Sequence, residues 1–168
     1  MTNIGALALR KKLQGIRSQN NGKSFELTIM HSVSKLKWGV LRIPDGCRSL
    51  GPQKLMRVKS PFDFVFYKQS QAIFCDVKTT DQTNFPKSKI KSHQLAELLD
   101  LEKQGFHAGY IVRFAKINWC VWFSAIKLAQ CQHRGSMKPL DGLRIGNSFE
   151  INPGLISASP SGLDASAP

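Results

Sequence analysis

Acidic residues are scarce in the first third of this sequence. Residues 1–60 contain twelve Lys and Arg but only two acids, Glu26 and Asp45, whereas residues 61–168 contain twelve basic and nine acidic residues. The totals of 24 and 11 give the chain a net charge of +13. Such an excess favours a polyanionic partner, because each cation placed on a phosphate releases condensed counterions. A merely solvated basic surface is the alternative that charge alone leaves open.

Long apolar runs and paired cysteines are also missing. No stretch approaches the roughly 18 consecutive apolar residues of a membrane-spanning helix, and the first eight residues are too short and wrongly flanked for a secretory signal. The four cysteines form no CxxC pair, which argues against a zinc site and against a disulfide framework. We therefore expect a protein of the reducing cytoplasm that makes no contact with a membrane.

The length predicts a single domain with one core, since 168 residues are too few for two ordinary domains. We predict a basic N-terminal arm over residues 1–19 and a folded domain over residues 20–150. Residues 151–168 are rich in Pro, Gly and Ser and show no apolar period, so we predict that they form a disordered tail.

Hydrophobic patterning predicts alternating helices and strands. A first helix begins near Asn21 and ends at Gly39, and a second begins with Ser92 as its cap and ends before Gly105. The segment "PDGCRSLGPQK" contains two prolines and two glycines, which predict a loop. Strands are expected in "GVLRIP", "KLMRVKS", residues 62–67, residues 72–79, "HAGYIVRFA" and "NWCVWFSA", with a short helix over residues 125–130. This order predicts an α/β fold with a central mixed sheet flanked by helices.

The stretch "SPFDFVFYKQSQAIFCDVKTT", residues 60–80, places three charges in two otherwise apolar strands. Asp76 and Lys78 lie two residues apart, so strand geometry directs both side chains to one face. A tight turn at residues 68–71 brings Asp63 within reach of the same place. Because a buried unpaired charge costs several kcal/mol, these groups must pair, stay hydrated or bind an ion.

Two neighbouring carboxylates repel each other, and a divalent cation relieves that repulsion. Oxygen ligands with no thiolate or imidazole beside them favour Mg²⁺ or Mn²⁺. A nearby ammonium such as that of Lys78 can orient or deprotonate water and offset charge on a pentacovalent phosphate. The residues alone leave a simpler alternative open, in which Asp76 and Lys78 form a salt bridge on a solvated edge strand and Asp63 lies at the surface.

The pattern of Asp63 followed by Asp76-Val77-Lys78 resembles the D…(D/E)-x-K signature of the metal-dependent nuclease superfamily that includes many restriction endonucleases and junction resolvases. Within that superfamily, five segments in the same order resemble the RecU-type Holliday-junction resolvases and span roughly residues 20–125. They are "NNGKSFE", "SPFDF", "FCDVKTT", "TNFPKSKIKSHQ" and "QGFHAGYIVRF".

The resemblance implies a restriction-endonuclease-like fold and a magnesium-dependent endonuclease, with manganese as a substitute, that cuts four-way DNA junctions as a homodimer. Asp63, Asp76 and the Val77 carbonyl would bind the metal, and Lys78 would serve the attacking water. Glu26 would add a carboxylate and Gln94 would lie near the site, although each also fits an ordinary helix-surface residue. Recombination proteins stay open as partners.

Two features depart from the family pattern. Aspartate stands at position 76 where the family usually has glutamate. The family also carries a stalk between its early strands that engages the junction centre, and here only residues 42–59 are available for it. This segment could be a reduced stalk or an ordinary DNA-contacting loop.

Basic residues in four places are candidates for phosphate contacts, with plain solvent exposure as the alternative. They are Arg10, Lys11 and Lys12 in the arm, Lys23 on the first helix, Arg42, Arg48, Lys54, Arg57 and Lys59 in the stalk segment, and Lys87, Lys89 and Lys91 in the loop after Thr80. If that loop is extended, alternation puts its three lysines on one side. Two rival functions stay open: a nuclease acting on ordinary duplex, and a noncatalytic nucleic-acid-binding protein.

Overall fold

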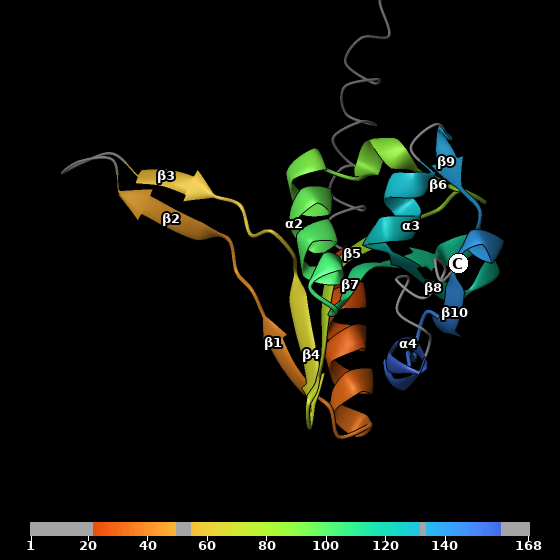
Figure 1. The fold of residues 1–168 in the computed structure, drawn as a ribbon. Coiled ribbons are helices and arrows are strands. Elements are labelled where there is room, and N and C mark those ends of the chain that lie inside the picture. Colours follow the sequence, from red (N-terminus) through yellow and green to blue (C-terminus); the bar gives the residue numbers. More distant parts are fainter. Residues whose placement is uncertain (1–21, 50–54, 132–133, 159–168) are drawn as a thin grey trace, which may run out of the picture.

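A six-stranded mixed sheet forms the centre of the protein (Figure 1), as the computed structural model shows for the residues it describes, 22–49, 55–131 and 134–158. The strand order is β1-β4-β5-β7-β8-β10, and every neighbouring pair is antiparallel except β5 and β7. The strands are β1 (Gly39–Arg42), β4 (Phe64–Lys68), β5 (Gln71–Thr80), β7 (His107–Phe114), β8 (Trp119–Ser124) and β10 (Leu143–Gly146). The predicted α/β fold with a central mixed sheet is confirmed.

Helices cover both faces of this sheet. The first helix, over residues 22–35, buries Phe25, Ile29 and Val33 against one face, because residues four apart lie on one side of a helix. On the other face lie α2 (Ser92–Lys103) and α3 (Ala125–Gln130), which bury Leu98 and Leu128. No helix in the described ranges is long and apolar enough to cross a bilayer.

The predicted hairpin of residues 60–80 is present as β4 and β5. A two-residue turn joins the strands, with Gln69 in the left-handed region at φ 54°. The strands pair from Lys68↔Gln71 to Phe64↔Cys75, and the Asp63 amide donates one more hydrogen bond, to the Cys75 carbonyl. Beyond that bond β4 diverges, so residues 76–80 pair with β7 alone and one edge of β5 is open.

The segment between β1 and β4 forms a two-stranded antiparallel ribbon. It consists of β2 (Gly46–Ser49) and β3 (Leu55–Val58), and it projects far from the rest of the molecule (Figure 1). The prediction of a strand around β3 is confirmed. The prediction of a loop up to that strand is wrong for residues 46–49, because pairing with β3 outweighs the local Gly and Pro signals.

The ends of the two main helices differ from prediction. The first helix ends at residue 35, before Gly39, because Lys37 adopts a left-handed conformation with φ 59°. Gly39 instead leaves space for the Tyr67 ring, since a Cβ at position 39 would lie 2.1 Å from Cζ of Tyr67. In α2 the N-cap is Lys91, not Ser92, and no side chain caps it. Gly105, at φ 92°, follows the end of α2 as predicted.

The predicted tail begins too early. Residues 151–158 are folded: Ile151 bridges to Gly146, and α4 (Gly154–Ser157) buries Ile156 in the core of the first helix. The prediction of disorder is therefore wrong for these residues, because burial of Ile151, Ile156 and Pro153 anchors this short segment. Residues 159–168 and the predicted arm, residues 1–19, lie outside the described residues.

Five short elements complete the described part of the fold. Strands β6 (Phe85–Pro86) and β9 (Ser136–Met137) pair with each other, and the 3-10 turns are η1 (Lys87–Lys89), η2 (Ala115–Ile117) and η3 (Pro139–Asp141). The η1 turn leads directly into the start of α2, so it lies beside the open edge of β5.

Candidate active site

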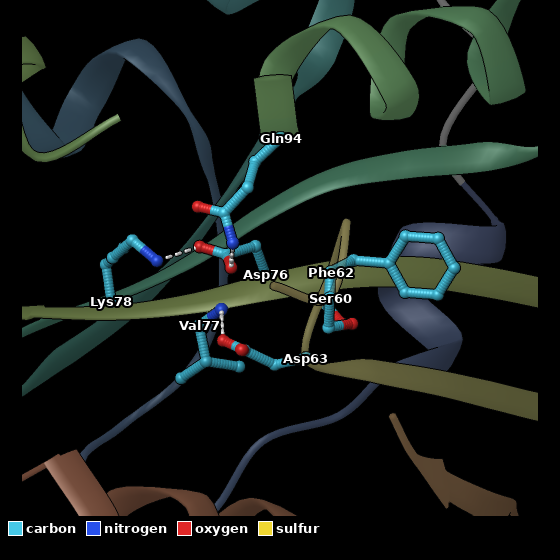
Figure 2. A network of polar contacts seen from close by, with 7 residues as sticks. All are labelled: Ser60, Phe62, Asp63, Asp76, Val77, Lys78 and Gln94. Carbon is cyan, nitrogen blue, oxygen red and sulfur yellow. Dashed lines mark hydrogen bonds and ion pairs between the residues drawn. The ribbon is translucent and has the colours of Figure 1, made fainter. Parts of the chain in front are cut away.

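Asp76, Lys78 and Gln94 form one polar network between β5 and α2 (Figure 2). Asp76 is fully buried, and its two carboxylate oxygens have different partners. Oδ1 accepts a hydrogen bond of 2.7 Å from Nε2 of Gln94, and Oδ2 forms an ion pair with the Lys78 ammonium. The strand alternation that predicted a shared face for Asp76 and Lys78 is thus confirmed.

Asp63 joins this network through the backbone of β5. Its Oδ2 accepts a hydrogen bond of 2.8 Å from the Val77 amide (Figure 2). The segment before it is held in place by Ser60, whose amide donates to Asp45 Oδ1 at 2.9 Å and whose hydroxyl donates to the Phe62 carbonyl. Because the N–H and C=O of one strand residue face the same edge, the Val77 carbonyl also faces the open edge of β5.

The electrostatics of the site are dominated by burial of Asp76. Burial raises the pKa of its carboxyl, the Lys78 ammonium lowers it and the charge of Asp63 raises it, and the net result is a pKa of about 7. Burial and the same two carboxylates also raise the pKa of Tyr110 and of Cys75. Negative charge is therefore costly here without an additional cation.

Tyr110 is a member of the site that sequence reasoning missed. It stands opposite Asp76 in the parallel register of β5 and β7, and the Lys78 Nζ lies 6.0 Å from the centroid of its ring. Among the described residues, the Tyr110 hydroxyl and Gln94 Oε1 are the buried side-chain atoms without a hydrogen-bond partner. The parallel pairing that brings Tyr110 beside Asp76 has no local sequence signal, because the two strands are separated by α2.

A cleft of about 380 Å³ opens next to Val77 and Lys78. Glu26 lines it from the first helix, but its Oε2 is bound by Arg42 at 3.0 Å. Glu26 therefore borders the site and has a partner other than the buried network. The first helix reaches the cleft with Phe25 as well, and that residue also anchors the helix to the sheet.

The predicted phosphate-contacting residues occupy several regions. Lys23 and Lys59 are exposed, and Arg42 is exposed while bound to Glu26. Arg48 and Arg57 belong to β2 and β3 of the projecting ribbon. Arg10, Lys11, Lys12 and Lys54 lie outside the described residues. Lys89 and Lys91 line the cleft, whereas the Lys87 ammonium donates to the Cys131 carbonyl at the end of α3.

The oxygen atoms beside β5 fit a hard divalent cation. Two carboxylates and one carbonyl converge there with no thiolate or imidazole among them, and a buried amide oxygen of Gln94 has no partner. The described residues contain no group of three or more His, Cys, Asp and Glu side chains that could hold a metal ion. Water or phosphate oxygens would have to complete the coordination.

Asp76 and Lys78 form an acid-x-lysine pair on the central strand β5, and Asp63 lies directly before the neighbouring strand β4. This arrangement is similar to the site of the D…(D/E)-x-K nucleases. The surrounding mixed sheet with helices on both faces is of the matching α/β class. A family model described as "Recombination protein U" (RecU) matches residues 34–143. The chain belongs to this RecU family. The matched range includes Asp63, Asp76, Lys78 and Gln94 and leaves out Glu26.

Twelve chains of solved structures match this protein, and one of them is a resolvase. The Holliday junction resolvase Hjc of the archaeon Archaeoglobus fulgidus is similar with a TM-score of 0.49 and 17% sequence identity, over 74% of this chain and 96% of that chain. No curated protein matches the sequence.

Proposed function

We propose that this chain is a divalent-metal-dependent DNA endonuclease that resolves four-way junctions by paired nicks during recombination or repair. Membership of the RecU family supports the substrate class. The observation that carries the chemistry is the convergence of Asp63, Asp76 and Lys78 at β5, beside the edge that β4 leaves unpaired.

Each residue of the network has a distinct role in this proposal. Asp63, Asp76 and the Val77 carbonyl would hold Mg²⁺, with Mn²⁺ as a substitute. When bound, the ion supplies charge that polarises the phosphate and lowers the pKa of water. Gln94 fixes the orientation of Asp76 through its 2.7 Å hydrogen bond. Glu26 is an additional carboxylate at the rim, which must leave Arg42 before it can take part.

Lys78 stands where it can act on the phosphate. Its ammonium pairs with Asp76, and its side chain is 19% exposed and belongs to a residue that lines the cleft. From there it orients the attacking water and offsets charge that develops on the pentacovalent phosphorus. The Lys78 ammonium can do this without a large movement, because its ion pair with Asp76 already fixes the position of the side chain.

The remaining assignments concern DNA and assembly. The projecting ribbon of β2 and β3 engages the junction centre as a short stalk, and the arm, residues 1–19, with the exposed lysines, contacts the DNA backbone. A homodimer supplies two symmetric nicks. Cys75, Cys120 and Cys131 are free thiols, which supports a cytoplasmic setting.

The substrate is tested with a synthetic four-way junction and a linear duplex of the same arm sequence, each incubated with the purified protein in Mg²⁺ and in EDTA. We expect symmetric nicks in the junction, in Mg²⁺ alone, with little cutting of the duplex. Equal cutting of both would favour the duplex nuclease. Binding without cutting in either Mg²⁺ or Mn²⁺ would favour a noncatalytic protein.

The raised pKa of Asp76 predicts a pH-dependent stability. The pKa is about 7 in the folded protein against 3.8 for an ordinary aspartate, so the folded state binds the extra proton between these values. The stability that protonation provides is therefore present below about pH 4 and is lost as the pH rises through 7. Asparagine does not ionise, so the Asp76→Asn variant does not lose this stability as the pH rises. It should be more stable than the wild type at pH 8 in EDTA by up to about 4 kcal/mol.

Thermal melts at pH 5 and pH 8 in EDTA measure this effect. The melting temperature of Asp76→Asn should exceed that of the wild type at pH 8, and the gap should narrow at pH 5. Adding Mg²⁺ at pH 8 should raise the melting temperature of the wild type only. The same gap at both pH values would contradict the assignment of a raised pKa to Asp76.

A further inference from the structure

The cleft beside Lys78 has the composition of an anion site. Its lining residues include three lysines, Lys78, Lys89 and Lys91, and two hydroxyl residues, Thr79 and Ser88. Its one carboxylate, Glu26, is bound by Arg42 at 3.0 Å. The positive charge of the lining therefore exceeds the negative, and hydrogen-bond donors are available beside it.

Lys89 is fixed in position at this cleft. Its Nζ donates a hydrogen bond of 2.9 Å to the Thr79 carbonyl. Thr79 lies two residues beyond Val77, so its carbonyl faces the same open edge of β5. The ammonium is thus held beside the strand that carries Lys78, and it still has donors to offer.

Lys91 brings the start of a helix to the same place. It is the N-cap of α2, the twelve-residue helix whose Gln94 contacts Asp76. No acidic residue lies in the first turn of α2, and no side chain caps it. Among the described residues the Lys91 side chain makes no ion pair. The positive end of the helix and the Lys91 ammonium therefore add to the charge of the cleft.

Lys87 does not belong to this group, although the spacing of the three lysines suggests that it should. The η1 turn takes the place of the extended conformation that would put all three lysines on one side, and Lys87 donates to the carbonyl of Cys131, the residue after α3. It is absent from the lining of the cleft. The structure thus selects two of three lysines that sequence alone could not separate.

We propose that this cleft binds a backbone phosphate of the cut DNA strand, the neighbour of the phosphate that is cleaved, through Lys89 and Lys91. This inference rests on the proposed function for the identity of the strand. The cleft shares Val77 and Lys78 with the candidate active site, so a strand lying at one continues into the other. Contacts of this kind fix the register of the strand and carry no base specificity.

The first test measures junction affinity in EDTA over a range of salt concentrations. The double variant Lys89→Gln/Lys91→Gln should bind about tenfold more weakly than the wild type, and the slope of log affinity against log salt should decrease by about 1. The matched control is Lys103→Gln/Lys127→Gln, which removes two exposed lysines of α2 and α3 outside the cleft. It should change affinity by less than about twofold.

Two further variants separate charge loss from misfolding. Lys89→Arg/Lys91→Arg keeps both charges and should retain most of the affinity, and melting curves of all variants should coincide with that of the wild type. If the glutamine variant binds like the control, the cleft is not a phosphate site. This readout requires no cleavage, so it holds even if the wild type cuts no DNA and the proposed function fails.

A second test locates the contacted phosphate. Junctions are prepared with a neutral methylphosphonate on either side of the cleaved position. At one of these positions the wild type should lose about tenfold in affinity and the glutamine variant less than about twofold, because both changes remove the same contact. Equal losses for both proteins at both positions would overturn the proposal.

Discussion

Asp76→Asn is expected to slow junction cleavage by about a thousandfold under single-turnover conditions, because several kcal/mol of transition-state stabilisation depend on this carboxylate. Asparagine keeps the shape and can still meet Gln94, so the fold should persist. Junction affinity in EDTA should stay within about threefold of the wild type, since Asp76 is fully buried and makes no phosphate contact. The rate is measured with a labelled junction and excess protein.

The matched control is Asp100→Asn. Asp100 lies on α2, as Gln94 does, but it is exposed and pairs with Lys103 at 3.5 Å. Its loss should leave cleavage and affinity unchanged. If Asp76→Asn cuts at the rate of this control, the catalytic role of Asp76 is wrong, and the buried network is structural.

Lys78→Met is expected to reduce the cleavage rate by about 10²- to 10⁴-fold, because it removes the ammonium that acts on water and phosphate. Methionine has a similar length and preserves contact with the Tyr110 ring. Lys78→Arg should recover part of the rate if the charge stabilises the transition state, and none if a deprotonated amine is required.

Lys103→Met provides the comparison for this substitution. Lys103 is exposed at the far end of α2, about 13.5 Å along the helix from Gln94. Unchanged cleavage is expected for Lys103→Met, and junction binding by Lys78→Met should persist. If the Lys78→Met protein cleaves at the wild-type rate, Lys78 has no catalytic role and serves only to neutralise the charge of Asp76.

The candidate site was largely predictable because its signals are local. Strand alternation places Asp76 and Lys78 on one face, and the tight turn after β4 brings Asp63 to β5. Strand alternation does not predict how Asp63 contacts the site. In the structure its carboxylate accepts a hydrogen bond from the Val77 amide. Tyr110 escaped notice because its position follows from parallel pairing across α2.

The wrong predictions about the fold also come from contacts between segments that are distant in the sequence. Strand β2 and the segment 151–158 contain Gly, Pro and Ser, which argue for loops when only neighbours in sequence are considered. In the structure, pairing with β3 and burial of Ile151 and Ile156 decide their conformation. Likewise, the 3-10 turn at Lys87–Lys89 follows from the pairing of β6 with β9, and the Lys87 amide donates to Gly135. These are contacts between distant segments, which local patterns do not encode.

A metal site at the open edge of β5 is tested most directly by anomalous diffraction from crystals of the wild type soaked in Mn²⁺. We expect one strong peak between the Asp63 and Asp76 carboxylates and the Val77 carbonyl, at about 2.0–2.3 Å from each oxygen. Crystals of Asp76→Asn should lack it. Wild-type crystals with no peak at this edge, or with the same peak in Asp76→Asn, would contradict the proposed site.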